Sequence, residues 1–343
     1  MNKTRFTTDL LEWYGNNKRI LPWRENTDPY RVWISEIMLQ QTRVEAVIPF
    51  FNRFIETLPT IEDCANASED SLNKLWEGLG YYSRVRNIRK AANIIMNEYS
   101  GVFPDTYEDM LSLPGIGPYT AGAISSISFN MKHTAVDGNV LRVFSRLYAI
   151  RENIKDITVK KNIKEKVESL LPKRKISEFN QGLMEIGATI CIPNGKPKCS
   201  NCPFSSYCLS NKKGLQNVIP FIERKKKRTV ENKTVVILRK DNLIAISKRP
   251  PTGLLAGLYE FPLYNEHFQF DSIKDMYQEN IMQSFILDDS KHLFTHKEWI
   301  MKAYLIDVIE IDSKYLWVTI DDLKHTYSIP NAYKAYKKFL NII

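Results

Sequence analysis

The hydrophobic and polar positions divide the chain into two halves with different periodicities. Residues 1 to about 210 show one helical pattern after another, with a break at Gly78-Leu79-Gly80. Helix-start signals occur at Asp28-Pro29, Ser68-Glu69 and Asp105-Thr106. We therefore expect this half of the chain to be all-α.

The second half mixes strand and helix patterns. The elements that these patterns predict are strands at 234–238, 243–247 and 299–308 and helices at 273–282 and 332–341. Lys240-Asp241-Asn242 separates the first two strands and is typical of a hairpin turn. We predict an α+β domain for this half.

A basic run, Arg224 to Arg228, lies between the two halves. We interpret it as part of a solvated linker, and contact of this run with DNA is the alternative. The predicted organisation is therefore a helical domain at 1–212, a linker at 213–230 and an α+β domain at 231–343.

Length and composition support two packed domains. The chain has 343 residues, of which 43% are hydrophobic and 11% aromatic. Its net charge of +9 and pI near 9.1 suit a polyanionic partner, although many basic proteins bind no nucleic acid. The amino terminus has no apolar signal core, and no apolar run reaches the length of a membrane span. We expect a soluble cytoplasmic protein without membrane association, and a monomer because nothing marks a symmetric interface.

The stretch from Leu113 to Val140 carries the first candidate chemistry. Gly115 and Gly117 allow a tight turn between helices and expose backbone amides that suit a DNA phosphate. Tyr119 and Asp137 follow at fixed offsets. The alternative is an ordinary helix cap at the glycines, with Asp137 capping a helix from Asn139 onward.

Glu36 is the second candidate group. The helix predicted from Pro29 through residues 30–44 places Glu36 on one face with Val32, Trp33, Leu39 and Gln40. Desolvation by large apolar neighbours would raise the pKa of Glu36 and leave an acid able to donate a proton near neutral pH. The alternative is a surface glutamate on an amphipathic helix.

Other side chains have the chemistry for contacts with bases. Gln40 and Gln41 are adjacent amides that could read or replace base edges. Tyr81 follows a glycine turn, where its ring could insert between bases or pack in a core.

Four of the five cysteines fall within 18 residues. They are spaced C-x7-C-x2-C-x5-C and are Cys191, Cys199, Cys202 and Cys208. Four thiolates in one loop can surround a tetrahedral zinc ion or an iron-sulfur cluster, and the spacing does not choose between them. With all four ligand positions taken, either metal would be structural.

Seven segments follow one another along the chain: Leu21–Arg24, Val32–Val44, Trp76–Arg84, Leu113–Ile124, Ala135–Val143, the four cysteines and Lys248–Pro262. Together they resemble the helix-hairpin-helix DNA glycosylases, and within them the adenine DNA glycosylase family. The resemblance implies excision, in base excision repair, of adenine paired with 8-oxoguanine or guanine in double-stranded DNA, leaving an abasic site. It also implies a [4Fe-4S] cluster on the cysteines and a Nudix-like carboxy-terminal domain that recognises the lesion.

The resemblance also implies roles for individual residues. Glu36 would protonate N7 of a flipped adenine, and Asp137 would remain ionised and face the positive charge that develops on the sugar. Asn139 would position the acid and the water, and Tyr119 would shape the charge around the sugar. Bifunctional relatives carry a lysine at the position of Tyr119, so this chain is expected to be monofunctional.

Further positions correspond to family contacts with DNA. Arg19 and Gln181 match positions near the bound adenine, and Gln41 and Tyr81 match residues inserted into the duplex. The positions that match the lesion-probing loop are Phe294, Thr295 and His296. The family commonly has serine at 295, and its first cysteine gap has six residues where this chain has seven.

Three other functions are compatible with parts of the sequence. Gly253–Glu260 faintly resembles the Nudix hydrolase signature, but the following residues lack its magnesium-binding glutamates. A non-enzymatic DNA-binding module would need neither Glu36 nor Asp137. A bifunctional pyrimidine glycosylase would need a lysine in place of Tyr119.

Overall fold

The computed structural model describes residues 2–223 and 227–341, and its contacts form two compact units. The first is Met1–Asn66 with Asn87–Arg224, and the second is Ala67–Arg86 with Lys225–Ile343. Residues 224–226 of the predicted basic linker lie outside the described residues. No helix in the described part of the chain combines the length and apolarity needed to cross a membrane.

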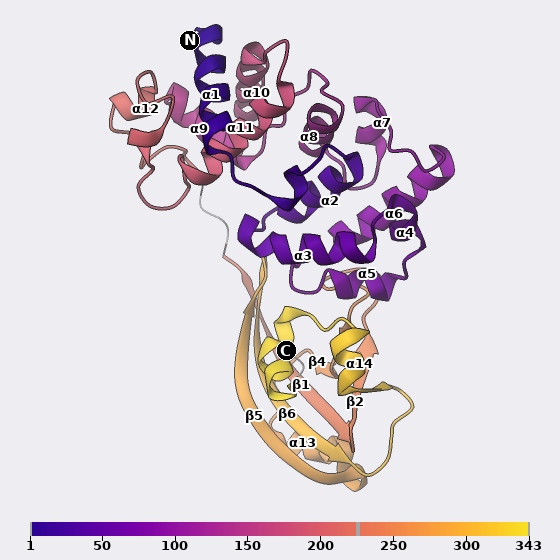
Figure 1. Ribbon diagram of the computed structural model, residues 1–343. Helices are drawn as coiled ribbons and strands as arrows, with labels where there is room; N and C mark the ends of the chain where they lie inside the picture. Colours follow the sequence, from indigo (N-terminus) through magenta and orange to yellow (C-terminus); the bar gives the residue numbers. More distant parts are fainter. Residues whose placement is uncertain (1, 224–226, 342–343) are drawn as a thin grey trace. The chain divides into compact units, whose positions relative to one another are not determined.

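The first unit is built from helices, which confirms the all-α prediction (Figure 1). Its elements are α1 (Lys3–Asn17), η1 (Pro22–Arg24), α2 (Pro29–Leu39), α3 (Val44–Thr57), α4 (Ile61–Asn66), most of α6 (Ser83–Glu98), α7 (Tyr107–Ser112), α8 (Pro118–Ser128), α9 (Gly138–Tyr148), α10 (Ile157–Leu170), α11 (Ile176–Thr189), η2 (Cys199–Asn201) and α12 (Leu209–Lys212). Asp28 and Thr106 cap α2 and α7, at two of the predicted helix starts.

The helix predicted to continue through residue 44 is shorter in the structure. Helix α2 ends at Leu39, and Gln41 has a φ of 60°. A left-handed residue cannot extend a right-handed α-helix, so the chain turns here before α3 begins at Val44. Gln41 therefore lies exposed at the tip of a turn.

Helices α7 and α8 and the turn between them form the hairpin predicted around the two glycines. Gly115 has a φ of 81°, and a Cβ there would lie 2.8 Å from Cβ of Asn87. Gly117 caps α8, and Pro118 occupies the first turn. The glycine at 115 is thus required both by backbone conformation and by the close approach of α6.

A core of aromatic and aliphatic side chains joins α1, α9, α10 and α11. Phe6 contacts the rings of Phe144, Phe179 and Phe204 at centroid distances of 6.0, 6.2 and 4.5 Å. This core fixes α9 and α11 against each other, and both helices contribute to the candidate site described below.

The second unit contains a seven-stranded mixed sheet with helices. Its elements are α5 (Glu69–Leu75), β1 (Thr229–Lys240), β2 (Leu243–Lys248), β3 (Tyr259–Glu260), β4 (Leu263–Tyr264), α13 (Phe270–Tyr277), η3 (Gln278–Asn280), β5 (Ile281–Leu293), β6 (Lys297–Val308), β7 (Leu316–Thr319), α14 (Ile320–His325), η4 (Asn331–Tyr333) and α15 (Lys334–Phe339). The main strand order is β3-β2-β1-β6-β5, with β4 beside β1 and β7 beside β2. Strands β1 and β6 are parallel, and the other pairs are antiparallel.

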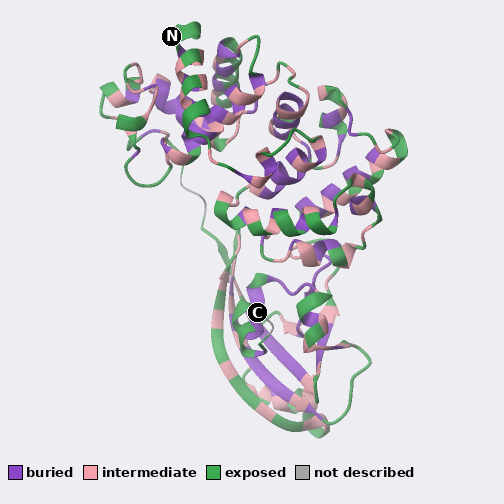
Figure 2. Ribbon diagram, in the orientation of Figure 1, coloured by how far each residue is buried: buried purple, intermediate pink, exposed green. Residues whose placement is uncertain are grey.

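Both faces of this sheet carry a hydrophobic core. On one face Val235 and Ile237 pack with Tyr333 and Tyr336, and on the other Val236 packs with residues such as Ile273 of α13. Figure 2 shows β1 and β6 largely buried and β5 mostly exposed or half-buried. The unit is thus the α+β domain that the sequence predicts.

Two predicted elements of the second half differ from the structure. The helix predicted at 273–282 is wrong in its last residues, because α13 ends at Tyr277 and β5 begins at Ile281. The helix predicted at 332–341 is a 3-10 turn followed by α15, Lys334–Phe339. The predicted strands all lie within β1, β2 and β6.

Residues 67–86 pack with the second unit, although the sequence suggests one continuous helical domain at 1–212. Glu77 forms ion pairs with both Lys74 and Lys337. Lys74 also donates to the carbonyl oxygen of Leu323 at 2.8 Å, and Arg86 donates to that of Ala256 at 2.9 Å. These polar contacts between residues far apart in the sequence attach the segment to the sheet domain.

Candidate active site

The first unit contains a cavity of about 1020 Å³, formed by η1, α2, α8, α11 and the start of α9. Nine of the candidate residues from the sequence line it: Arg19, Glu36, Gln40, Gln41, Gly117, Tyr119, Asp137, Asn139 and Gln181. The cavity therefore brings together two carboxyl groups that lie 101 positions apart in the chain.

Glu36 is a buried carboxyl group on α2, with 6% of its surface exposed. Burial raises the pKa of Glu36 to about 7, and the negative charge of Asp137 adds to the rise. A hydrogen bond from Tyr119 and the charge of Arg24 act in the opposite direction. Glu36 can therefore hold and donate a proton near neutral pH.

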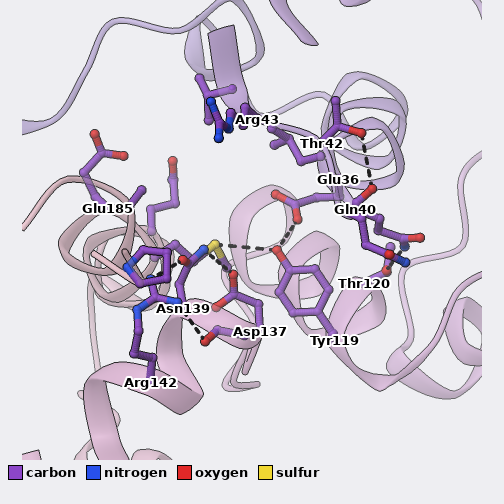
Figure 3. Close-up of a pocket in the computed structure, with 18 of the residues that line it drawn as sticks. Glu36, Gln40, Thr42, Arg43, Tyr119, Thr120, Asp137, Asn139, Arg142 and Glu185 are labelled. Atoms are coloured by element: carbon purple, nitrogen blue, oxygen red, sulfur yellow. Dashed lines mark hydrogen bonds between the residues drawn. The ribbon is translucent and has the colours of Figure 1, made fainter. Parts of the chain in front are cut away.

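Tyr119 is hydrogen-bonded to one of the two carboxyl groups, that of Glu36. Its hydroxyl donates to Oε2 of Glu36 at 2.5 Å and lies 3.7 Å from Sδ of Met184. Figure 3 shows this hydroxyl directed at Glu36, with Asp137 and Asn139 on its other side. Burial and the two neighbouring carboxyl groups raise the pKa of Tyr119 well above 10, so it stays a neutral donor.

Asp137 is both a helix cap and a cavity residue. It caps α9, where Oδ1 accepts from the Val140 amide at 2.8 Å and Oδ2 accepts from Nδ2 of Asn139 at 2.7 Å. Burial raises the pKa of Asp137, while these two hydrogen bonds and the charge of Arg142 oppose the rise. Both oxygens thus have donors that suit a carboxylate.

Arg142 and Arg146 connect this carboxylate to the cysteine-rich loop. Arg142 donates to Oδ1 of Asn139 at 2.7 Å and to the carbonyl oxygen of Cys191 at 2.7 Å. Arg146 donates to Sγ of Cys191 at 3.3 Å. The sequence interpretation missed both arginines, although both lie on the helix capped by Asp137.

Arg19 shares a buried carboxylate, Glu185, with Arg24. Glu185 accepts from Nε of Arg19 at 2.6 Å and from Arg24 at 2.8 Å. Neither Arg24 nor Glu185 was among the predicted site residues. The sequence did contain a signal for both residues, because Arg24 in LPWR and Glu185 in GLMEIGATI are each a charged residue among apolar ones.

The amide of Gln181 is held on both sides. Its Oε1 accepts from the Tyr14 hydroxyl at 3.0 Å, and its Nε2 donates to Oγ of Ser177 at 2.9 Å. These bonds fix the orientation of the amide at the cavity wall.

Of the predicted DNA contacts outside the cavity, Gly115 lies in the turn between α7 and α8 of the first unit, and the others belong to the second unit. The hydroxyls of Tyr81 and Thr295 are 3.1 Å apart, and Tyr81 has a φ of 49° and is 47% exposed. Phe294 packs edge-on against Trp299 with ring centroids 4.9 Å apart, and the carbonyl oxygen of His296 accepts from the Thr229 amide at 3.1 Å. The structure therefore groups the predicted wedge residue with the predicted lesion-probing loop.

The four cysteines are free thiols in neighbouring positions. Burial raises the pKa of Cys202 to about 12, and Cys191, Cys199 and Cys208 lie close enough to add to that rise. Within the described ranges, no three His, Cys, Asp or Glu side chains form a ready-made site for a metal ion. The donor set, four soft sulfur atoms, nevertheless fits iron-sulfur or zinc chemistry.

Comparison with family models assigns both units. Residues 34–169 match the model of the HhH-GPD superfamily base excision DNA repair protein, and residues 234–338 match that of the NUDIX domain. The helix-hairpin-helix and the cavity with two carboxyl groups thus define the class: this is a DNA glycosylase of base excision repair.

Relatives at the level of whole chains identify the family. The adenine DNA glycosylase of Buchnera aphidicola subsp. Baizongia pistaciae is 37% identical over 92% of each chain, and that of Schizosaccharomyces pombe is 32% identical over 98% of this chain and 90% of the relative. The chain belongs to the adenine DNA glycosylase family.

Solved structures agree with this fold. A thermostable thymine-DNA glycosylase superimposes with a TM-score of 0.56 at 30% identity, covering 62% of this chain and 97% of its own. A non-covalent endonuclease III–DNA complex gives a TM-score of 0.54 at 24% identity, covering 63% of this chain and 99% of that chain, and supports the fold alone.

Proposed function

We propose that this glycosylase excises adenine paired with 8-oxoguanine or guanine in duplex DNA and leaves an abasic site. The observation that carries the proposal is the meeting of Glu36 and Asp137 in one cavity, with the Tyr119 hydroxyl between them. One group is suited to donate a proton and the other to face a cation, which are the two needs of glycosidic bond cleavage.

The scissile bond of a stacked adenosine is inaccessible, so the nucleotide must leave the duplex. We propose that the cavity accepts the flipped nucleotide, with Arg19 and Gln181 beside the base. Gln41 at the turn after α2 and Tyr81 of the second unit would fill the space that the base leaves.

Acid catalysis falls to Glu36. Because Tyr119 donates to Oε2, the proton to be transferred belongs on Oε1. Its transfer to N7 of adenine makes the base a better leaving group, and the neutral Glu36 needed for this step exists because burial raises its pKa to about 7.

Asp137 acts on the sugar. As the base departs, positive charge develops on the deoxyribose, and the Asp137 carboxylate stabilises it directly or through a transient covalent bond to C1′. Asn139 holds Oδ2 of Asp137 and helps to place the attacking water. Tyr119 has no amine to form a Schiff base, which makes the enzyme monofunctional.

Recognition of the opposite base is assigned to Phe294, Thr295 and His296 of the second unit. Thr295 retains a hydroxyl where the family commonly has serine, and this hydroxyl lies within hydrogen-bond distance of Tyr81. The loop that reads the lesion and the ring that enters the duplex would then act as one element.

Cys191, Cys199, Cys202 and Cys208 would hold the [4Fe-4S] cluster. A cluster would supply structural support for the loop, since its four thiolate ligands leave no position for substrate. The four thiols are neighbours and offer only sulfur ligands, and the family resemblance supports the cluster, with a single zinc ion as the alternative.

The activity is tested with duplexes that pair adenine with 8-oxoguanine or with guanine. We expect free adenine to appear, and strand breaks only after hot alkali. Glu36→Gln and Asp137→Asn should each lower the single-turnover rate by a factor of about 100 or more. Asn at 137 can still cap α9, so the variant should keep its fold. Strand breaks before alkali, or release of a pyrimidine and no adenine, would refute the proposal.

The cluster is tested by the absorbance spectrum of the purified protein. We expect a yellow-brown protein with a broad visible band and about four iron atoms per chain. A colourless protein that contains one zinc per chain would show that the single-ion alternative is correct.

A further inference from the structure

Glu185 is a buried carboxylate at the cavity wall whose role the mechanism above leaves open. It lies on α11 with 1% of its surface exposed. Its Oε1 accepts from Nε and the backbone amide of Arg19 at 2.6 and 3.3 Å. Its Oε2 accepts from Nη2 of Arg19 at 3.2 Å and from Nη2 of Arg24 at 2.8 Å.

The two arginines are thereby tied to each other as well as to Glu185. Nη1 of Arg24 donates to the carbonyl oxygen of Arg19 at 3.2 Å, and the Arg24 guanidinium lies over the Tyr14 ring at 5.7 Å. Both arginines and Glu185 line the cavity that holds Glu36. One buried anion thus orients two cations beside the proposed acid.

The side chains that shift the pKa of Glu36 lie on three of the elements around it. They are Tyr119 on α8, Asp137 at the start of α9 and Arg24 on η1. Helix α3 also packs against α2, but Arg43, Glu45, Arg53 and Glu56 are not among the main groups that shift the pKa of Glu36. Arg24 is therefore the cation that most directly opposes a neutral Glu36.

We propose that Glu185 is a positioning residue of this enzyme: its carboxylate neutralises and orients Arg19 and Arg24, so that the cavity keeps Glu36 in its acid form. This role depends on the proposed function, in which Glu36 donates a proton to the departing base. Without Glu185, one or two unneutralised guanidinium groups would face the cavity and stabilise the Glu36 carboxylate.

The charge effect predicts the direction of a pH shift. Glu36 works when protonated, so the excision rate falls as pH rises through its pKa. Glu185→Gln removes the neutralising charge and should move this alkaline limb to lower pH by about one unit. At a pH one unit above the midpoint of the wild-type alkaline limb, Glu185→Gln should be about tenfold slower than wild type. At low pH, where Glu36 is protonated in both proteins, the two rates should be the same.

The experiment measures single-turnover excision rates against pH, together with the infrared titration of the Glu36 carboxyl in the protein without DNA. A Glu36→Gln difference spectrum assigns the band. Glu185→Asp keeps the charge and should restore the wild-type limb. Glu45→Gln is the matched control, because Glu45 pairs with Arg19 at 3.5 Å but is 78% exposed, and it should leave the limb in place.

A uniform loss of rate at all pH values, with the Glu36 band unchanged, would show that Glu185 only supports the fold and would overturn the proposal. If Glu185→Gln fails to fold, Arg24→Gln gives the opposite test: loss of that cation should move the Glu36 titration to higher pH. The infrared titration needs no substrate, so failure of wild-type protein to release adenine would count against the proposed function and leave this test intact.

Discussion

At the scale of residues, burial of the Glu36 carboxyl group lowers the stability of the folded protein at pH values where this group is ionised. The pKa of Glu36 is about 7 in the folded protein, above its ordinary value of 4.5. The folded state therefore binds the proton more tightly than the unfolded chain, and the stability contributed by Glu36 falls as pH rises from about 4.5 to 7. Catalytic competence and stability thus make opposite demands on this side chain.

Glu36→Gln should consequently stabilise the protein at alkaline pH while it abolishes acid catalysis. The amide never ionises, so the variant should gain about 3 kcal/mol in free energy of unfolding relative to wild type between pH 4 and pH 8. Urea unfolding at both pH values measures this gain. Glu45→Gln, at an exposed side chain, is the control; equal differences at both pH values for Glu36→Gln would contradict the prediction.

Some site residues could be predicted because their surroundings come from neighbouring residues in the sequence. Others could not, because their contacts form only when distant segments pack together. The apolar neighbours of Glu36 lie three and four residues away on one helix, so its burial can be predicted from spacing. Glu185 meets Arg19 across 166 positions, and only tertiary packing creates that contact. The sequence analysis treated helix capping and a chemical role as alternatives for Asp137. In the structure Asp137 caps α9 and also lines the cavity.

At the scale of elements, the close approach of α11 to α9 positions Asn139. Gly187 on α11 permits this approach, since a Cβ there would lie 2.4 Å from Cβ and 3.1 Å from Cα of Asn139. Any larger residue must push Asn139, and with it the hydrogen bond to Asp137, out of place.

Gly187→Ala should therefore lower the excision rate by at least about tenfold and cost about 1–3 kcal/mol of stability. Gly182→Ala, on the same helix, is the matched control, because its added Cβ would meet Leu10 at 3.0 and 3.3 Å and Cβ of Tyr14 at 3.3 Å, which are less close than the approach to Asn139. Single-turnover rates and urea unfolding of the two variants measure both effects. Similar rates for the two variants would show that α11 does not hold Asn139.

The limits of the predicted elements have the same kind of cause. The α2 pattern continues past Leu39, but the left-handed Gln41 ends the helix and lets α3 start in a new direction. Strand β5 was missed because its residues do not alternate regularly between buried and exposed. Among the described strands it pairs with β6 alone, so it is an edge strand, and such a strand does not need that alternation. Strands β1, β2 and β6 were predicted because both of their faces are covered.

At the scale of the whole molecule, ion pairs with little exposure attach residues 67–86 to the sheet domain. Glu77 is 11% exposed at its side chain and binds the ammonium groups of Lys74 and Lys337. Removing a carboxylate from such a site leaves buried positive charge without its counter-charge.

Glu77→Gln should destabilise the second unit by about 3 kcal/mol. Hydrogen exchange of the full chain measures the loss of protection in peptides from residues 67–86 and from α15. Asp70→Asn is the control, since Asp70 pairs with Lys248 at 3.0 Å where both side chains are more exposed, and should cost less than about 1 kcal/mol. Equal protection in the two variants would contradict a structural role for Glu77.

The sequence could not reveal where residues 67–86 pack. The helical pattern there is like that of its neighbours, and the lysine that completes the Glu77 site lies 260 positions later. The domain limits 1–212, 213–230 and 231–343 therefore remain predictions. In the structure, residues 67–86 from within the first predicted domain belong to the second compact unit.

Because residues 67–86 pack with the sheet domain, the carboxy-terminal part of the chain cannot be exchanged alone without breaking their contacts. A chimera that exchanges the carboxy-terminal part at the linker would separate Tyr81 from the threonine hydroxyl it meets and Glu77 from Lys337. A functional chimera must transfer residues 67–86 together with the carboxy-terminal segment. A single crossover at the linker would separate residues 67–86 from the carboxy-terminal segment that they contact. These two stretches should therefore be inherited together.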